Sequence, residues 1–261
     1  MRRWLPVILI AIGFVLPATD ACAQKFNLQL WQDCVVDRPF GKRNQFLYET
    51  EFSYQTVLNS DNKWRSYNLT PDIEWSVFRR MDLIGAMAIC YTQQNDTTNT
   101  LELRPMVGVR WYFTPGWRIE TRLLLRLEYR NNYVFDTRQW ETEGRTRIRA
   151  EFLVPINKKR YSADHMTYAL SDAEFFFPFK NDVSERYSNR IRLRIGLGYR
   201  LNYNWRMEGI YTLQRSRNEI GSSFSTVDNI FRIRLKIFLP LKHRDTRKND
   251  TGSTTVGGAG T

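Results

Sequence analysis

The segment "NIFRIRLKIFL", from Asn229 to Leu239, alternates between two kinds of side chain. Successive side chains of a β-strand point to opposite faces of the sheet. One face would carry Phe231, Ile233, Leu235, Ile237 and Leu239, and the other would carry Arg232, Arg234, Lys236 and Phe238. The segment therefore predicts a strand whose surroundings accept an apolar face on one side and a mostly cationic face on the other.

The same alternation recurs in three long segments, 117–130, 141–154 and 187–201, each of which sets aliphatic residues against charged ones. Their charged faces hold Arg118, Glu120, Arg122, Arg126, Glu128 and Arg130, then Glu141, Glu143, Arg145, Arg147, Arg149 and Glu151, then Arg190, Arg192, Arg194 and Arg200. A period of two rather than 3.6 indicates strands rather than helices. We therefore expect an all-β chain with no amphipathic helix beyond the first residues.

Clusters of Gly, Pro, Asn and Asp separate these segments, as turns require. The division predicts about ten strands, within a range of about eight to twelve. They fall near 45–57, 64–78, 82–93, 100–113, 117–133, 140–154, 166–179, 187–201, 204–217 and 226–240. Connections at 79–82, 114–116 and 201–204 are short, whereas those on the other side are longer, with 155–165 as the exception. Short turns on one side, longer loops on the other and an even strand count are typical of an outer-membrane barrel.

The first residues resemble a secretory signal peptide. Arg2 and Arg3 precede an apolar run from Trp4 to Leu16, and a small-residue cleavage pattern ends at Ala23. The run is too short to anchor the chain in a bilayer, and a lipoprotein role for Cys22 is the alternative. Because the mature chain would leave the cytoplasm, we expect no nucleic-acid partner despite the net charge of +12.

The expected organisation is a signal peptide at 1–23, a lead-in at 24–44, a barrel at 45–240 and a disordered tail at 241–261. The lead-in could equally be a plug or an extra strand. Cys34 and Cys90 remain after cleavage, and a disulfide is permitted outside the cytoplasm. Their spacing leaves it open whether they pair.

The interpretation depends on which face of the barrel wall meets lipid. An arginine on the lipid face at the bilayer midplane would cost about 2–4 kcal/mol, so the arginines should face a lumen. Aromatic residues gather near the two predicted rims, as interfacial belts do. They are Trp75, Phe78, Trp111, Phe113, Trp117, Tyr199, Tyr203, Trp205 and Phe238 near the tight turns, and Tyr54, Trp64, Tyr129, Tyr133, Trp140, Phe179 and Tyr211 near the other rim. A soluble, basic periplasmic β-sheet binding module is the alternative, because alternation looks the same when the faces are inverted.

We therefore predict a closed, up-and-down antiparallel transmembrane β-barrel with an Arg/Glu-lined lumen. Candidates for contact with an ion or solute in that lumen are Arg118, Glu120, Arg122, Arg126, Glu128, Arg130, Arg145, Arg147, Arg149, Glu151, Asp172, Glu174, Arg190, Arg192, Arg194, Arg232, Arg234 and Lys236. The acidic strand near 166–179 would lie between two arginine-rich strands, and the strand with Glu49 and Glu51 would close against the last strand. Such pairing favours a structural barrel, whereas excess positive charge favours a narrow, anion-leaning channel.

Catalysis finds little support in the sequence. His165 and His243 are the two histidines, and His165 lies in the 155–165 connection near Ser162, Asp164 and Ser171. No metal-ligand spacing, phosphate loop or nucleophile elbow is present. We expect no enzymatic activity and no cofactor, with a membrane-embedded, lipid-modifying hydrolase as the alternative.

Three stretches carry a resemblance to a known family. They are "RIRLRIGLGYRLNYNWRMEGIYTLQRSRN" at 190–218, "PMVGVRWYFTPGWRIETRLLLRLEYR" at 105–130 and the closing "DNIFRIRLKIFL". The run from Phe46 to Pro240 is similar to the domain-of-unknown-function 2490 family of predicted outer-membrane barrel proteins. The resemblance implies a barrel in the outer membrane, and it points to no particular activity, because the family's name assigns none. The partners expected in that location are membrane lipid and lipopolysaccharide, the barrel-insertion machinery through Asn229–Leu239, and small anions.

Overall fold

The computed structural model describes residues 25–41, 45–58, 64–94, 99–114, 118–159, 163–179, 189–217 and 226–239. These residues form eleven β-strands. The strands are β1 (Lys25–Phe40), β2 (Phe46–Val57), β3 (Arg65–Phe78), β4 (Met81–Gln93), β5 (Asn99–Tyr112), β6 (Glu120–Val134), β7 (Gln139–Pro155), β8 (Met166–Pro178), β9 (Asn189–Arg200), β10 (Trp205–Arg217) and β11 (Thr226–Phe238). The predicted signal peptide and C-terminal tail lie outside the described residues.

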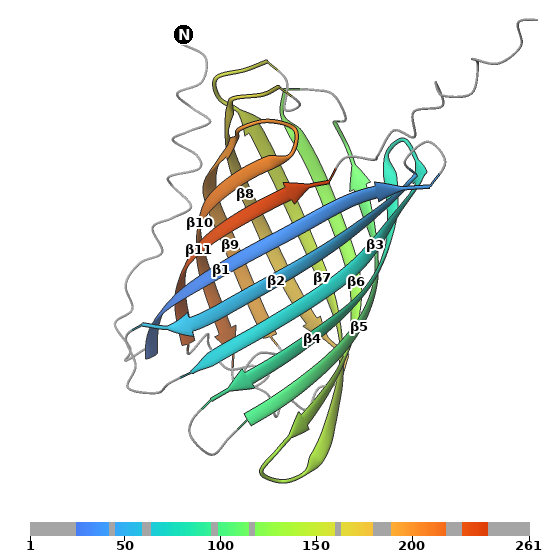
Figure 1. Cartoon of the computed structure of the whole chain (residues 1–261). Helices are drawn as coiled ribbons and strands as arrows, with labels where there is room; N and C mark the ends of the chain where they lie inside the picture. Colours follow the sequence, from blue (N-terminus) through green and yellow to red (C-terminus); the bar gives the residue numbers. More distant parts are fainter. Residues whose placement is uncertain are drawn as a thin grey trace, which may run out of the picture.

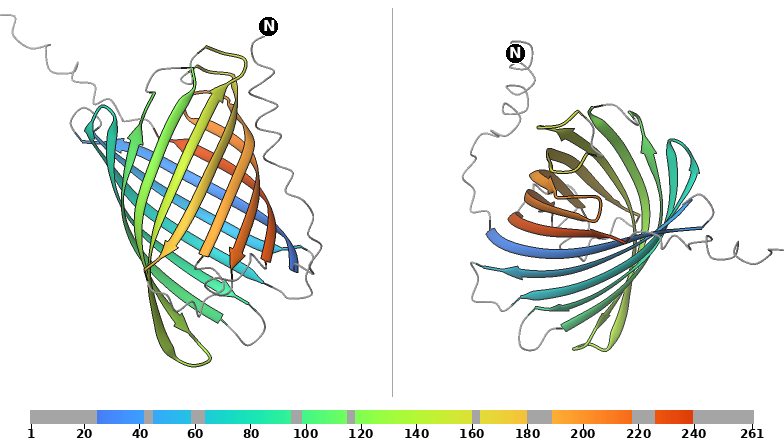
Figure 2. Two further views of the ribbon diagram at one scale, coloured as in Figure 1. Left: turned by 180° about the vertical axis from the view of Figure 1, so that it is seen from behind. Right: turned by 45° about the horizontal axis from the view of Figure 1, so that its top comes forward.

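The strands close into one barrel in sequence order, with β1 completing the ring against β11. Figures 1 and 2 show a strongly tilted wall in which each strand lies beside its sequence neighbours. All neighbouring pairs from β1 to β11 are antiparallel, whereas the closing pair of β1 and β11 is parallel. The predicted closed all-β barrel is confirmed. No helix that could cross a bilayer occurs in the described part of the chain.

The barrel has one strand more than the central prediction of ten. The additional strand is β1, which comes from the segment expected to be a lead-in. Its alternation is weak because Trp31 and Val35 point inward, while Gln32 and Arg38 are exposed on the outside. Without a clean apolar face, the segment gave no clear strand signal. The odd count makes the closing pair parallel, which an even, up-and-down barrel does not have.

The odd count also places the beginning of β1 and the end of β11 at opposite ends of the barrel. We call the end where β1 begins the N-terminal end, and the end where β11 finishes the C-terminal end. The other ten strands begin and end within a few residues of their predicted bounds. The largest shift is at β6, which begins at Glu120, so the connection from β5 is longer than the predicted turn at 114–116.

The two faces of the wall differ as the opening segment predicts. On β11, Phe231 and Ile233 are 50% and 56% exposed on the outer surface, whereas Arg232 between them is 7% exposed. The same inside–outside alternation runs along β6, where Leu125 and Leu127 are exposed and Glu128 is buried. The aliphatic rows therefore cover the outside of the barrel, and the charged rows fill the inside.

Aromatic side chains are exposed near both ends of the wall. At the C-terminal end they include Trp75, Phe78, Trp111, Phe113, Tyr203 and Trp205, and at the N-terminal end Tyr129, Trp140 and Phe179. The side chain of Trp64 was predicted to belong to an aromatic belt, but it lines the interior cavity instead. It precedes β3 by one residue, so the alternation of that strand directs it inward.

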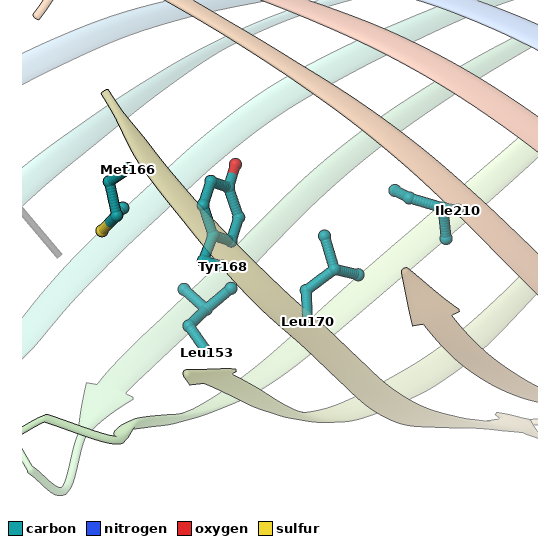
Figure 3. Close-up of a cluster of buried hydrophobic side chains, with 5 residues drawn as sticks. All are labelled: Leu153, Met166, Tyr168, Leu170 and Ile210. Atoms are coloured by element: carbon teal, nitrogen blue, oxygen red, sulfur yellow. The ribbon is translucent and has the colours of Figure 1, made fainter. Parts of the chain in front are cut away.

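An apolar cluster occupies the interior toward the C-terminal end. Its members are Leu153 of β7, Met166, Tyr168 and Leu170 of β8, and Ile210 of β10 (Figure 3). The ring of Tyr168 lies over Gly198, where a Cβ atom would come within 2.2 Å of the ring. The hydroxyl of Tyr168 donates a hydrogen bond to Glu208 over 2.6 Å. The lack of a side chain at position 198 therefore lets Tyr168 fill this part of the lumen.

Candidate functional site: the charged lumen

A cavity of about 440 Å³ lies inside the barrel, and its lining runs from Trp64 and Glu141 at the N-terminal end to Glu49, Ile84 and Arg110 toward the C-terminal end. Among the described residues, its lining includes twelve arginines and five carboxylates. The arginines are Arg104, Arg110, Arg126, Arg130, Arg145, Arg147, Arg149, Arg190, Arg192, Arg194, Arg232 and Arg234. The carboxylates are Glu49, Glu51, Asp72, Glu102 and Glu141. The surface that meets the cavity is therefore rich in positive charge.

Most of the candidate residues from the sequence lie on the interior of the wall. Ten of them line the cavity: Arg126, Arg130, Arg145, Arg147, Arg149, Arg190, Arg192, Arg194, Arg232 and Arg234. Seven others are on inward positions outside the cavity lining: Glu120, Arg122, Glu128, Glu151, Asp172, Glu174 and Lys236. Arg118 does not belong to this set. It is exposed in the connection between β5 and β6, because β6 begins two residues later.

Glu128 of β6 is a buried centre of ion pairing. Its side chain has no exposed surface, and it lies 3.3 Å from Arg126, 2.6 Å from Arg145 and 3.2 Å from Arg147. Arg147 also contacts Glu174 of β8. A buried carboxylate that is held by several guanidinium groups avoids the cost of an isolated buried charge. This arrangement relieves the repulsion between arginines on the adjacent strands β6 and β7.

Strand β8 supplies carboxylates between two arginine-rich strands, as predicted. Asp172 is paired in register with Arg194 of β9, and their charged atoms are 2.6 Å apart. Glu174 lies in register between Arg149 of β7 and Arg192 of β9, with 3.5 Å to the second of these. Acidic residues on the middle strand thus neutralise basic residues on both neighbours.

The closing seam differs from the prediction. The strand with Glu51 was expected to lie next to the last strand, but β1 lies between them. Asp33 of β1 contacts Arg232, and it lies 3.3 Å from Arg234. Arg232 also reaches past β1 to Glu51 over 2.8 Å. The acidic and basic strands therefore still pair, through a strand that contributes a carboxylate of its own.

Several interior residues were absent from the candidate set. Arg130 bonds Glu102 over 2.7 Å, and Glu102 also holds Arg104 at 2.6 Å. Arg110 pairs with Glu74 at 2.5 Å. Glu102, Arg104 and Arg110 alternate with Leu101, Leu103 and Val109 along one strand, so the period of two could have indicated their inward position.

The region around His165 shows an exposed side chain in a left-handed backbone conformation, with φ of 51°. Its Nδ1 atom lies 3.2 Å from the hydroxyl of Tyr199. Asp164 is close to Arg200, at 3.9 Å, and Ser171 is exposed on the outside of β8. Ser162 lies outside the described residues. Cys34 and Cys90 are both free thiols, and the described residues contain no group of side chains arranged to hold a metal ion.

These features define a closed β-barrel with an apolar exterior and a charged, arginine-rich interior. The chain belongs to a family whose model is described as protein of unknown function (DUF2490), and the match covers residues 28–225. The resemblance stated from the sequence is thus confirmed. No curated protein and no solved structure matches the chain.

Proposed function

We propose that this protein is an outer-membrane β-barrel whose lumen admits small anions and passes them as a narrow, anion-leaning channel. The single observation that carries the proposal is the cavity lining, with twelve arginines and five carboxylates among the described residues. Rings of fixed positive charge favour anions over cations in a pore. The carboxylates of Glu128 and Glu174 are buried and do not line the cavity, so arginines outnumber carboxylates on the surface that a solute meets.

The location in the outer membrane rests on the exterior. Apolar and aromatic side chains are exposed over the outside of the wall, as a lipid-facing surface requires. An apolar depression of about 850 Å³ crosses the outside of β7 to β11, where Ala169, Ser171 and Gly209 are small. Lipid and lipopolysaccharide acyl chains are the proposed neighbours of this surface. Recovery in the soluble periplasm, without a heat-dependent gel shift, would contradict this location.

The proposed insertion signal is the segment Asn229–Leu239, most of which lies in β11. Its outward row is apolar, and in the finished barrel its free edge is paired with β1. The insertion machinery would therefore contact this strand before β1 closes the ring.

Planar-bilayer recording of the purified protein tests the channel. In a KCl gradient, we expect a reversal potential that reports preference for chloride. Arg190→Gln with Arg192→Gln should reduce this preference, because both side chains line the cavity. Arg118→Gln with Arg138→Gln is the matched control, because it also removes two charges and both residues are exposed in connections outside the lumen. A cation preference would contradict the proposal.

A structural barrel without transport is the second candidate. It is favoured by the density of buried ion pairs, such as those of Glu128, and by the apolar cluster around Tyr168 toward the C-terminal end. Such a barrel would give no conductance in the same bilayer recording.

We propose no catalytic role for His165, which is exposed in a connection and hydrogen-bonded to Tyr199. His165→Ala should leave the lipid A and phospholipid profiles of the membrane unchanged. A changed lipid profile would support the hydrolase alternative.

A further inference from the structure

We propose that the part of the lumen toward the N-terminal end is a binding site for an acidic saccharide, a small sugar that carries a carboxylate or phosphate group. The inference deepens the proposed function and rests on it in one respect, the access of solutes to the lumen from this end. It goes beyond a general preference for anions, because it assigns one wall of the cavity to the charge of the ligand and the other wall to its hydroxyl groups.

The first wall is cationic. Four guanidinium groups surround the ring of Phe176 on β8, at 4.9 Å for Arg145, 5.1 Å for Arg147, 5.8 Å for Arg190 and 5.2 Å for Arg192. All four arginines also line the cavity. They come from β7 and β9, the two neighbours of β8.

Phe176 explains why positive charge is concentrated at this place. Inward positions on β8 hold Asp172, then Glu174, then Phe176. Phe176 is in register with Arg147 of β7, and its neighbour Phe175 is in register with Ile191 of β9. Toward the N-terminal end, an aromatic ring thus takes the position that carboxylates occupy further along the strand. The ring packs against the guanidinium groups and adds no negative charge to that of Glu128 and Glu174, which pair with Arg145, Arg147 and Arg192.

Toward the N-terminal end, the second wall is mostly uncharged and polar, and its Glu102 and Arg104 pair with each other. It is formed mainly by β2 to β5, across the barrel from β7 to β9, and Figure 1 shows β2 and β3 at the front with β7 and β8 behind. The lining side chains from this wall include Ser53, Gln55, Ser66, Asn68, Thr92 and Thr100. Hydroxyl and amide groups can donate and accept hydrogen bonds at once. A ligand with several hydroxyl groups uses such a surface fully, whereas a simple ion does not.

The neutral wall is ordered by its own hydrogen bonds. The hydroxyls of Ser66 and Thr92 are 2.9 Å apart, and the amide of Asn68 donates to Ser66 over 3.4 Å. These bonds leave the side-chain oxygen of Asn68 available as an acceptor, since an amide carries two donors and one carbonyl oxygen. The wall is therefore oriented before a ligand arrives, which reduces the entropic cost of binding.

Two tryptophans complete the site. Trp64 lines the cavity at the N-terminal end and is partly exposed, so its flat ring is available to the C–H face of a sugar. Trp31 lies between two cavity-lining arginines, with 5.3 Å to Arg192 and 5.6 Å to Arg232. It acts as a positioning residue that holds these guanidinium groups. The cavity volume of about 440 Å³ is in the range of small-molecule sites.

Isothermal titration of the full-length barrel in detergent tests the proposal with four probes at equal ionic strength. They are digalacturonate, glucose 1-phosphate, the neutral disaccharide maltose and inorganic phosphate. We expect digalacturonate or glucose 1-phosphate to bind about tenfold more tightly than both maltose and phosphate, a difference of about 1.4 kcal/mol. Phosphate or maltose binding as tightly as the better-bound of the two acidic sugars would overturn the proposal, as would no binding of any probe.

Variants separate the two walls. Arg192→Gln should weaken binding of the acidic sugar and of phosphate together, whereas Asn68→Ala should weaken only the sugar. An equal loss for phosphate in Asn68→Ala would overturn the assignment of the neutral wall. Arg118→Gln is the control, and heat-dependent gel mobility checks folding. If phosphate alone binds, the saccharide site is wrong, but a lumen that admits anions is still supported. If an acidic sugar binds but the bilayer recordings show no anion preference, the proposed channel is wrong, but the saccharide site is still supported.

Discussion

Arg232 of β11 forms an ion pair with Glu51 of β2 over 2.8 Å, although β1 lies between their two strands. It spans this distance beside Asp33 of β1, which it also contacts. The seam of the barrel is therefore joined by charges that reach over a strand, in addition to the parallel backbone ladder of β1 and β11. Asp33 contacts both Arg232 and Arg234 of β11, so we expect it to stabilise the closure.

We expect Asp33→Asn to lower the free energy of unfolding by about 3 kcal/mol, because two guanidinium groups lose a fully buried partner. Urea unfolding of the protein in detergent micelles measures the change. The adjacent residue Gln32 points outward on the same strand, so Gln32→Leu is a control that should be neutral or stabilising. An equally small effect of both substitutions would contradict the role of Asp33.

Glu128 should contribute more to the free energy of unfolding than Glu120, although both residues belong to β6. Glu128 is buried and shared by three arginines, so Glu128→Gln should cost about 3–5 kcal/mol. Glu120 is partly exposed and pairs with Arg122 at 2.7 Å, so Glu120→Gln should cost less than about 1 kcal/mol. The two variants are compared by urea titration under one condition, and a larger loss of stability for Glu120→Gln would contradict the central place of Glu128 in the ion-pair network.

Ile195 tests whether the exterior meets lipid. It lies near the middle of β9 and is 58% exposed. In a bilayer, Ile195→Arg should cost about 2–4 kcal/mol, because the charge would enter the hydrocarbon region. Folding into lipid vesicles under urea measures this cost, with Ile195→Leu as the control. An arginine tolerated at this position without loss would favour a water-exposed wall.

Tyr168 should restrict passage at the C-terminal end. Its side chain is fully buried, covers Gly198 and bonds Glu208. Tyr168→Ala removes the ring from the lumen, so we expect the single-channel conductance to increase. Tyr129→Ala is the control, since Tyr129 is exposed on the outside of β6. Unchanged conductance in a folded Tyr168→Ala barrel would show that the ring lies off the route of the ions.

The odd number of strands predicts on which side of the membrane each end of the barrel sequence lies. With eleven strands, an epitope placed just before Lys25 and one placed just after Leu239 should lie on opposite sides of the membrane. Protease accessibility in intact and permeabilised cells distinguishes the sides. Epitopes on the same side would indicate an even number of spanning strands.

The sequence by itself determined the class of structure, because alternation along a strand depends only on residue order. Ile195 and Arg194 could be assigned to opposite faces of the wall without knowing which strands lie beside them. It also predicted that the strand with Asp172 and Glu174 lies between two arginine-rich strands, since neighbouring strands in an up-and-down barrel are neighbours in sequence. The same reasoning identified ten of the eleven strands.

Only the tertiary structure decided the features that depend on ring closure and volume. Closure placed β1 between Glu51 and Arg232, although the faces of β1 are too mixed to reveal a strand. Packing across the lumen brought Tyr168 onto Gly198 and set four arginines around Phe176, contacts between residues on different strands. Alternation fixes the side of the wall on which a residue lies, but the position and tilt of the other strands fix what it meets there.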